Sequence, residues 1–160
     1  MRGFEYVASE HKKNTNDTQL PFRKTAHSAG YDFPSPINIK LKPREQKMIW
    51  MDFKAYMQPS ECLLVYIRSS LAVKYNITLC NNVGVIDSDY FSNPSNDGNI
   101  GICLRNNGRD TVEIKEGDYI AQGIFTNYLV GNNCNYGEHY SREGGFGSTD
   151  QKAVVKNQLN

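Results

Sequence analysis

Three side chains in the stretch NNVGVIDSDY, residues 81–90, have the chemistry of an active site: the carboxylates of Asp87 and Asp89 and the ring of Tyr90. The apolar run before them, residues 83–86, predicts a buried strand, and the Asn, Pro, Ser, Asp and Gly residues after them predict a turn. Asp87 would then stand where the strand leaves the core, and Tyr90 can meet it only if the chain bends. A carboxylate in that place can serve as a general base, although a polar turn with a half-buried tyrosine explains the stretch more simply on its own.

Arg68, Ser69 and Ser70 follow the strongest strand signal in the chain, the apolar residues 62–67. Because this run is short, continuous and apolar, we expect a strand that is buried on both faces. A guanidinium and two hydroxyls at the mouth of such a strand are costly to bury unless an anion or a carboxylate meets them. The sequence therefore predicts a phosphate-binding turn here, followed by one helical turn over residues 71–75.

Asp32 lies in the sequence AGYDFP, between the aromatic residues Tyr31 and Phe33. Gly30 allows the backbone to turn tightly, and Pro34 favours an extended conformation for the residue before it. We expect the Asp32 carboxylate to be displayed between its aromatic neighbours.

Glycines are dense near the C-terminus, in the sequence REGGFGST at residues 142–149. Successive backbone N–H groups of such a segment can point at an anion, Arg142 can bind phosphate through two donors, and Ser148 and Thr149 add hydroxyl donors. Phe146 is a ring that can close over a flat ligand. A disordered glycine-rich tail is the alternative explanation for the glycines alone.

Short strands at near-regular spacing must position these residues. Apolar runs bounded by turn residues lie at residues 37–41, 48–57, 62–67, 77–80, 83–86, 100–104, 112–114 and 120–125. We expect the run at 100–104 to return as the partner of 83–86 after a long hairpin connection. Because no long helical period separates the runs, the sequence predicts an all-β sandwich or jelly-roll.

The ends of the chain carry weaker signals. We expect at most a short strand within residues 1–24, where residues 11–17 have the composition of a solvated loop. Residues 131–160 lose periodicity and are expected to form a flexible C-terminal arm. The whole chain, residues 1–160, is expected to be one domain.

Composition restricts the class of partner. Lys and Arg together number 18 and Asp and Glu 17, so the chain lacks the charge excess expected for stable binding to nucleic acid or to an anionic membrane, and a small ligand is expected instead. The cysteines Cys62, Cys80, Cys103 and Cys134 are too far apart for zinc or redox motifs, and three of them lie in apolar runs typical of buried thiols. No stretch approaches the roughly twenty apolar residues of a membrane helix. We expect a soluble, intracellular, reduced protein.

Five motifs stand in a fixed order along the chain: AGYDF, RSSLA, GVIDSDY, EGDYIAQG and REGGFGST. Together they resemble the five ordered motifs of the trimeric dUTPase family, and a match of five motifs in order is far more specific than any single one. The resemblance implies a jelly-roll or distorted β-barrel that hydrolyses dUTP to dUMP and diphosphate with Mg²⁺, which keeps uracil out of DNA and supplies dUMP for thymidylate synthesis. It also implies a homotrimer with shared active sites, in the cytoplasm of a bacterium or a phage-infected cell.

The resemblance also implies a role for each motif residue. Asp87 is implied as the general base that deprotonates the water attacking the α-phosphorus, and Tyr90 as the ring that packs against deoxyribose and excludes a 2′-hydroxyl. Asn81 is implied as the amide that meets the uracil edge, with Asn82 as its less suitable substitute. Asp32 is implied to hold Mg²⁺ through water.

The remaining implied contacts surround the phosphates and the base. They come from Arg68, Ser69, Ser70, Gln122, Arg142, Phe146, Gly147, Ser148 and Thr149. The last five belong to the C-terminal arm, which in the family reaches the site of a neighbouring subunit and closes over uracil and the β- and γ-phosphates.

The chain departs from the family pattern at three places. Residues 91–97 are inserted between Tyr90 and Gly98, Arg142 stands one residue closer to the double glycine, and Asp150 replaces a usual glycine. Because of the insertion, the sequence does not fix the register of the second strand of the hairpin. Because of the shorter spacing, it does not fix whether Arg142 reaches the phosphates. A carboxylate at position 150 is expected to turn away from a triphosphate.

Two alternatives stay open. One is a dCTP deaminase, or a bifunctional deaminase and diphosphatase, of the same superfamily. The AGYD and GVIDSDY motifs fit the uracil enzyme better than either. The other is a dUTPase fold that acts as a regulatory protein-binding module, with residues 91–97 as the surface for its protein partner.

Overall fold

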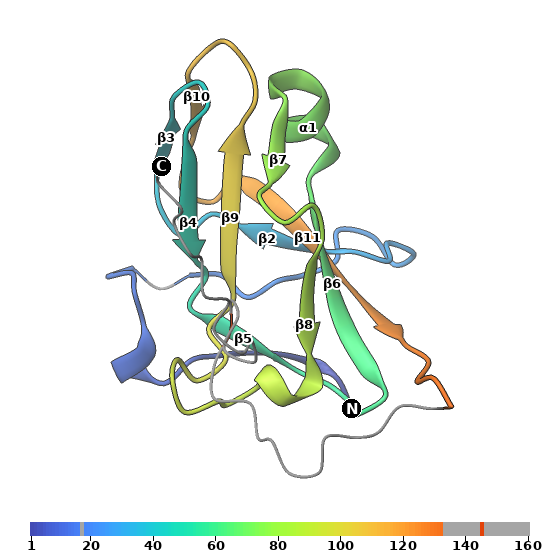
Figure 1. Ribbon diagram of the computed structural model, residues 1–160. Helices are drawn as coiled ribbons and strands as arrows, with labels where there is room; N and C mark the ends of the chain where they lie inside the picture. The colour runs from blue at the N-terminus through green and yellow to red at the C-terminus, as the bar shows by residue number, and fades with distance from the viewer. Residues whose placement is uncertain (17, 133–144, 146–160) are drawn as a thin grey trace, which may run out of the picture.

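The computed structural model describes residues 1–16, 18–132 and 145. Two larger sheets and two strand pairs make up the fold, and every pairing is antiparallel (Figure 1). The four-stranded sheet has the order β2 (Tyr31–Pro34), β11 (Tyr119–Asn127), β6 (Glu61–Ile67), β8 (Gly84–Asp87). The three-stranded sheet has the order β4 (Gln46–Trp50), β9 (Gly101–Asn106), β7 (Ile77–Leu79).

The two smaller pairs and the helices complete these layers. The pairs are β1 (Gly3–Tyr6) with β5 (Phe53–Tyr56), and β3 (Ile39–Leu41) with β10 (Val112–Ile114). The helices are the 3₁₀ turns η1 (Ser9–His11) and η2 (Ser88–Tyr90) and the α-helix α1 (Ser69–Tyr75). Among the described residues α1 is the single α-helix, and with seven residues it is too short to cross a bilayer. The predicted all-β, jelly-roll-like class is confirmed.

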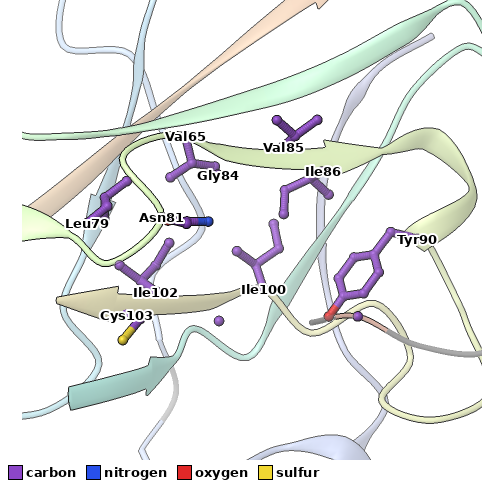
Figure 2. Close-up of a pocket in the computed structure, with 12 residues that line it drawn as sticks. Val65, Leu79, Asn81, Gly84, Val85, Ile86, Tyr90, Ile100, Ile102 and Cys103 are labelled. Atoms are coloured by element: carbon purple, nitrogen blue, oxygen red, sulfur yellow. The ribbon is translucent and has the colours of Figure 1, made fainter. Parts of the chain in front are cut away.

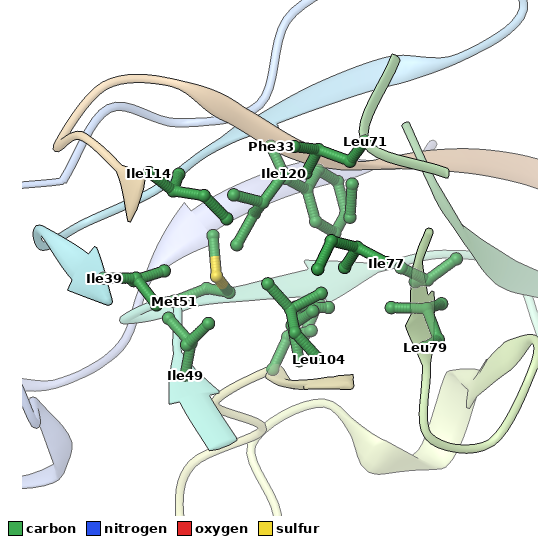
Figure 3. Packing of buried hydrophobic residues seen from close by; sticks show 14 of the residues in the cluster. Phe33, Ile39, Ile49, Met51, Leu71, Ile77, Leu79, Leu104, Ile114 and Ile120 are labelled. Atoms are coloured by element: carbon green, nitrogen blue, oxygen red, sulfur yellow. The ribbon is translucent and has the colours of Figure 1, made fainter. Parts of the chain in front are cut away.

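The core fills the space between the sheets with apolar side chains from almost every strand (Figure 3). Phe33, Leu41 and Leu104 are fully buried, and in β3 the exposed Lys40 separates two buried side chains, as the strand period of two requires. Burying a side chain of this size stabilises the fold by about 1.5–3 kcal/mol, so the core supplies the main favourable term. It gives the sheets a rigid frame for the polar residues at their edges.

Strand β8 lies at the edge of its sheet, and the prediction of a buried strand is wrong in this respect. It pairs with β6 on one side, and its residue Val85 is 56% exposed. The neighbouring strand β6 was expected to be buried on both faces, but Leu64 and Tyr66 are only partly buried while Leu63 and Val65 are fully buried. One face of this sheet therefore packs on the core and the other does not.

Strand β9 is the expected strand after the long connection, but it is not the hairpin partner of β8. It pairs with β4 and β7 in the three-stranded sheet instead. The two strands diverge into different sheets because η2 bends the chain directly after Asp87. Helix α1 begins at Ser69, so it has about two turns where one was predicted over residues 71–75, and Asn76 ends it in the left-handed conformation (φ 54°).

The N-terminal segment forms the expected loop over the described residues 12–16, with Lys13, Thr15 and Asn16 exposed, but the loop is also anchored. His11 ends η1, and the backbone N–H groups of Lys13 and Asn14 both donate to the buried Asp52 carboxylate at 2.8 Å. The Asn14 side chain donates to the same carboxylate. Asp52 thereby ties this segment to the turn between β4 and β5.

Candidate functional site

A pocket of about 190 Å³ lies between β8 and β9 (Figure 2). Gly84 of β8 lines one wall, Ile100 and Ile102 line the other, and Asn81 and Tyr90 also face the space. Because β8 pairs with β6 and β9 belongs to the other sheet, no strand ladder joins β8 to β9 in the described chain. The pocket is therefore a slot between the edge strand β8 and the part of β9 that lies beyond its pairing with β7, which suits a flat ligand with hydrogen-bonding edges.

A tight turn presents Asn81 to this pocket. The Val83 N–H donates to the Asn81 carbonyl at 2.7 Å, and Asn82 takes the left-handed conformation (φ 63°). Figure 2 shows the Asn81 amide nitrogen directed into the space between the strands, and a Cβ atom at Gly84 would stand 3.9 Å from that nitrogen. Asn81 thus offers a side-chain amide to the pocket, whereas Asn82 does not line it.

Tyr90 forms the other end of the pocket and is only 5% exposed. The predicted bend after Asp87 is confirmed, because η2 carries Tyr90 back toward the pocket. The Tyr90 hydroxyl donates to the Asn99 carbonyl at 2.9 Å and accepts from the Asn96 side chain at 2.7 Å. The ring is therefore held by its polar end.

Asp87 lies at the end of β8, between the pocket residues Ile86 and Tyr90, but its own side chain does not line the pocket. Its partner across the ladder is Cys62 of β6. Burial raises the pKa of the Cys62 thiol, and the negative charge of Asp87 raises that pKa further. The ladder register thus places the half-buried Asp87 side chain on the same face of the sheet as Cys62, whereas Ile86, which lines the pocket, lies on the other face.

Asp32 belongs to a second, charged cluster. It is 3% exposed rather than displayed, because its carboxylate accepts a 2.7 Å hydrogen bond from Arg68 and lies 3.8 Å from the Lys24 ammonium. Gln122 is the ladder partner of Asp32 on β11, and a Cβ atom at Gly30 would stand 2.5 Å from the Gln122 amide oxygen. Glycine at position 30 is what allows Gln122 to lie here.

Ser69 and Ser70 form the exposed first turn of α1, directly after Arg68. Two hydroxyls and a guanidinium thus lie at one end of β6, as the sequence predicted. Cys62, the residue of β6 that pairs with Asp87, lies near the other end of this strand. Six residues of extended strand separate Cys62 from Arg68, which is about 20 Å. One chain therefore does not bring Asp87 and Arg68 together over one triphosphate.

The described residues contain no group of three or more His, Cys, Asp or Glu side chains that could hold a metal directly. Asp32 has one carboxylate oxygen bonded to Arg68 and the other near Lys24. This donor set does not fit a directly bound cation. It fits contact through water to a Mg²⁺ ion whose other ligands are phosphate oxygens, because Mg²⁺ keeps several of its waters.

Five predicted site residues of the arm, together with Asp150, lie outside the described residues. They are Arg142, Phe146, Gly147, Ser148 and Thr149. Gly145, which belongs to the same motif, is described and lines the pocket of its own chain. A Cβ atom there would stand 2.9 Å from the Tyr90 ring, so only glycine lets the backbone approach the ring this closely.

Sequence reasoning missed the polar residues that hold Tyr90 from behind, Asn93, Asn96 and Asn99. They are buried or partly buried in the loop of residues 91–99. The density of asparagine in this loop was the available signal, because asparagine side chains bond readily to nearby backbone groups. It was interpreted only as a turn.

Comparison with known proteins gives consistent matches. The dUTPase family model matches residues 16–150. A deoxyuridine 5'-triphosphate nucleotidohydrolase from Lactococcus lactis subsp. lactis (strain IL1403) is 42% identical over 149 residues, 93% of this chain and 97% of the relative. The crystal structure of a dUTPase from Streptococcus mutans has a TM-score of 0.72 and 36% identity, over 82% of this chain and 99% of that one. A mutant dUTPase from phage phi11 of S. aureus, described with a structural Mg(II) ion, has a TM-score of 0.67 and 20% identity, over 86% of this chain and 97% of that one, and shares the fold.

Proposed function

The chain belongs to the dUTPase family and is therefore a dUTP diphosphatase, and we propose that it cleaves dUTP by attack of water on the α-phosphorus, with Asp87 as the general base. Water is a poor nucleophile until a carboxylate takes its proton, and such help is worth about 10²- to 10⁴-fold in rate. Asp87 is suited to this step because it lies along the chain between two residues that line the pocket, Ile86 and Tyr90, while its own side chain does not line it. A base held in the pocket would then place its phosphates outside, toward Asp87.

The pocket supports uracil and deoxyribose as the parts that bind there. A uracil edge offers two carbonyl acceptors and one N–H donor, which the Asn81 amide and the facing strand edges can pair with. The wrong pyrimidine would leave buried polar groups unpaired, and such mismatches cost large factors in rate. The Tyr90 ring closes the sugar end and leaves no space for a 2′-hydroxyl.

The separation of the two polar clusters along β6 supports a homotrimer with shared active sites. Asp87 and Arg68 are too far apart in one chain to meet one nucleotide, so the phosphate contacts Arg68, Ser69, Ser70 and Gln122 would come from a second subunit. Closed cyclic symmetry repeats such a site three times without leaving an unmatched surface. The arm residues Arg142 and Phe146 to Thr149 would complete the phosphate contacts and exclude water. Gly145 contacts the Tyr90 ring of its own chain, so the subunit that each arm closes over is part of the proposal.

Magnesium fits this scheme as an ion carried by the triphosphate. When bound, Mg²⁺ neutralises the negative charge that develops on the leaving diphosphate. Asp32 would hold a water of its hydration shell, and Arg68, while paired with Asp32, keeps this carboxylate oriented. Because dUTP belongs to the intracellular nucleotide pool, we place the activity in the cytoplasm.

The observation that carries this proposal is the slot between β8 and β9, with Asn81 and Tyr90 facing it and Asp87 between the lining residues Ile86 and Tyr90 along the chain. The test is diphosphate release from dUTP, dTTP, dCTP and UTP, each with Mg²⁺ and with excess EDTA. We expect release from dUTP to be faster by orders of magnitude than the slow release from the other three, and to require Mg²⁺. Ammonia release from dCTP would instead support the deaminase, and no release from any of the four would leave a binding module as the function.

The loop of residues 91–97 offers Ser92, Pro94 and Ser95, which are exposed, to a regulatory protein partner. Asn93 is buried, and Phe91, Asn96 and Asp97 are partly buried. These four residues have a use within the molecule.

A further inference from the structure

The loop of residues 91–99 holds Tyr90 at two places, its main-chain carbonyl and its phenolic hydroxyl. The Asn93 side chain donates to the Tyr90 main-chain carbonyl at 2.8 Å, and the Asn96 side chain donates to the Tyr90 hydroxyl at 2.7 Å. The same hydroxyl donates to the Asn99 carbonyl at 2.9 Å. A phenol with both a donor and an acceptor in place cannot rotate or slide without breaking a buried hydrogen bond.

Asn96 is itself fixed by its other side-chain atom. Its amide oxygen accepts from the Asn93 side chain at 2.7 Å and from the Gly98 N–H at 3.1 Å. The Asn93 amide oxygen in turn accepts from the Ser95 N–H and hydroxyl, both at 3.1 Å. The side chain that meets Tyr90 is therefore oriented by a network within the loop.

The loop is also fastened to the frame of the protein. Asp97 accepts hydrogen bonds from the Ala8 N–H at 2.8 Å and from the Lys54 ammonium at 2.9 Å. Burial alone would raise the pKa of Asp97, but these hydrogen bonds hold the pKa below its ordinary value. Asn99 exchanges hydrogen bonds with the backbone and carboxylate of Asp52. The loop behaves as part of the rigid structure, so it can fix a side chain in the pocket.

We propose that Asn96 is a positioning residue that fixes the Tyr90 ring against the sugar and thereby sets the selectivity for 2′-deoxyribose over ribose. The inference rests on the proposed function. The 2′-hydroxyl of ribose is excluded only if the Tyr90 ring cannot move away from it. A displacement of about 1 Å in an active site changes rates by large factors. Asn96 acts through the Tyr90 hydroxyl, behind the face that the sugar would meet.

The experiment compares Asn96→Ala, Tyr90→Phe and the double variant with the natural protein. The readouts are kcat/KM for dUTP divided by kcat/KM for UTP, and the melting temperature. We expect Asn96→Ala to lower the ratio by about tenfold, the size of one buried hydrogen bond. Tyr90→Phe should lower it by a similar factor, and the double variant should fall no further than the larger single effect, because both changes remove the same contact.

Ser95→Ala is the matched control, because it removes a hydrogen bond inside the loop without touching Tyr90. It should change the ratio by less than about twofold, whatever it does to the melting temperature. An unchanged ratio in Asn96→Ala, multiplying effects in the double variant, or an equal fall of the ratio in Ser95→Ala would each overturn the inference. If Asn96→Ala does not fold, an unchanged ratio in Tyr90→Phe overturns it instead. Absence of dUTP hydrolysis by the natural protein would overturn the proposed function itself.

Discussion

Beside Val65 of β6 the chain forms a pocket with neutral walls, whereas beyond Ile67 it gathers charge around Asp32 and Arg68. The pocket is shaped by neighbouring strands and by a ring held in place, and among the described residues no charged side chain lines it. The charged cluster has no comparable shape, and its carboxylate is already paired with a guanidinium. The difference teaches that one chain builds a neutral pocket and a separate charged cluster. Under the proposed function the pocket takes the base, the cluster meets the phosphates, and assembly joins the two.

Removal of the Asp87 carboxylate should lower the rate of dUTP hydrolysis more than any other change described below. We expect Asp87→Asn to lower kcat for dUTP by about a thousandfold, because the attacking water loses its base, while dUTP still binds through the pocket. Diphosphate release measures the first effect and titration calorimetry the second. Undiminished turnover would remove Asp87 from its role, and loss of binding would show that Asp87 holds the nucleotide rather than activating water.

Mixing of two inactive variants tests whether the two ends of β6 meet across subunits. We expect Asp87→Asn and Arg68→Gln each to be nearly inactive. After they are unfolded and refolded together, about one site in four should recover activity, because random assembly pairs an intact Asp87 with an intact Arg68 that often. Arg68→Gln leaves Lys24 beside the buried Asp32, which limits the loss of stability.

The control for this mixing is each variant refolded alone at the same concentration. Activity that stays at the level of the separate variants after mixing would mean that both residues serve a site within one chain. That result would remove the difference between the two ends of the strand as an argument for assembly.

Truncation before Arg142 removes the arm that, in the proposed function, closes over the pocket. We expect at least about a tenfold loss of turnover, since donors to the phosphates and protection from water are lost. The melting temperature should stay close to that of the full chain, because the core of the described chain is built from residues 4–125. A large fall in melting temperature would contradict the idea that the arm serves only the site.

The smallest effect concerns the thiol of Cys103 in the pocket wall. Burial and the neighbouring Cys80 thiol raise the pKa of Cys103 to about 11. Below pH 10 its alkylation by iodoacetamide should therefore be slow and should rise about tenfold per pH unit, because the thiolate is the nucleophile. In urea the same thiol should react as an ordinary cysteine does, and fast alkylation of the folded protein at pH 8 would contradict a neutral pocket wall.

The raised pKa of Cys103 also predicts how the free energy of unfolding changes with pH. Between the ordinary thiol pKa and about 11 the unfolded chain loses this proton while the folded chain keeps it. The free energy of unfolding should thus fall as the pH rises through that window. Unfolding by urea at pH 8 and pH 10, for the natural chain and for Cys103→Ser, measures the difference.

The sequence predicted the strands well because alternation and turn residues are local signals. It also placed Asp87 correctly at a strand end followed by a bend. It failed where a property depends on the partner of a strand: Val85 is exposed and Ile102 faces the pocket from another sheet, although both lie in apolar runs. Asp32 was expected to be displayed because nothing in its neighbours along the chain indicates Arg68, 36 residues away.

The asparagines of the loop show a second limit. Asn93 and Asn96 act through hydrogen bonds whose geometry exists only once Tyr90 is in place. Composition identifies such a segment as a turn and cannot reveal what the turn holds. The relation between the two clusters along β6 is of the same kind, because it requires the register of the ladder.

Among the described strands β8 has a neighbour on one side only, β6 (Figure 1). Its residues Gly84, Val85 and Ile86 line the pocket. Unpaired strand edges are where foreign strands add and where proteins aggregate, and most folds cover them. A strand added at this edge would close the slot. Storage with a nucleotide should consequently preserve a purified sample, since whatever fills the slot also shields the molecule from its own copies.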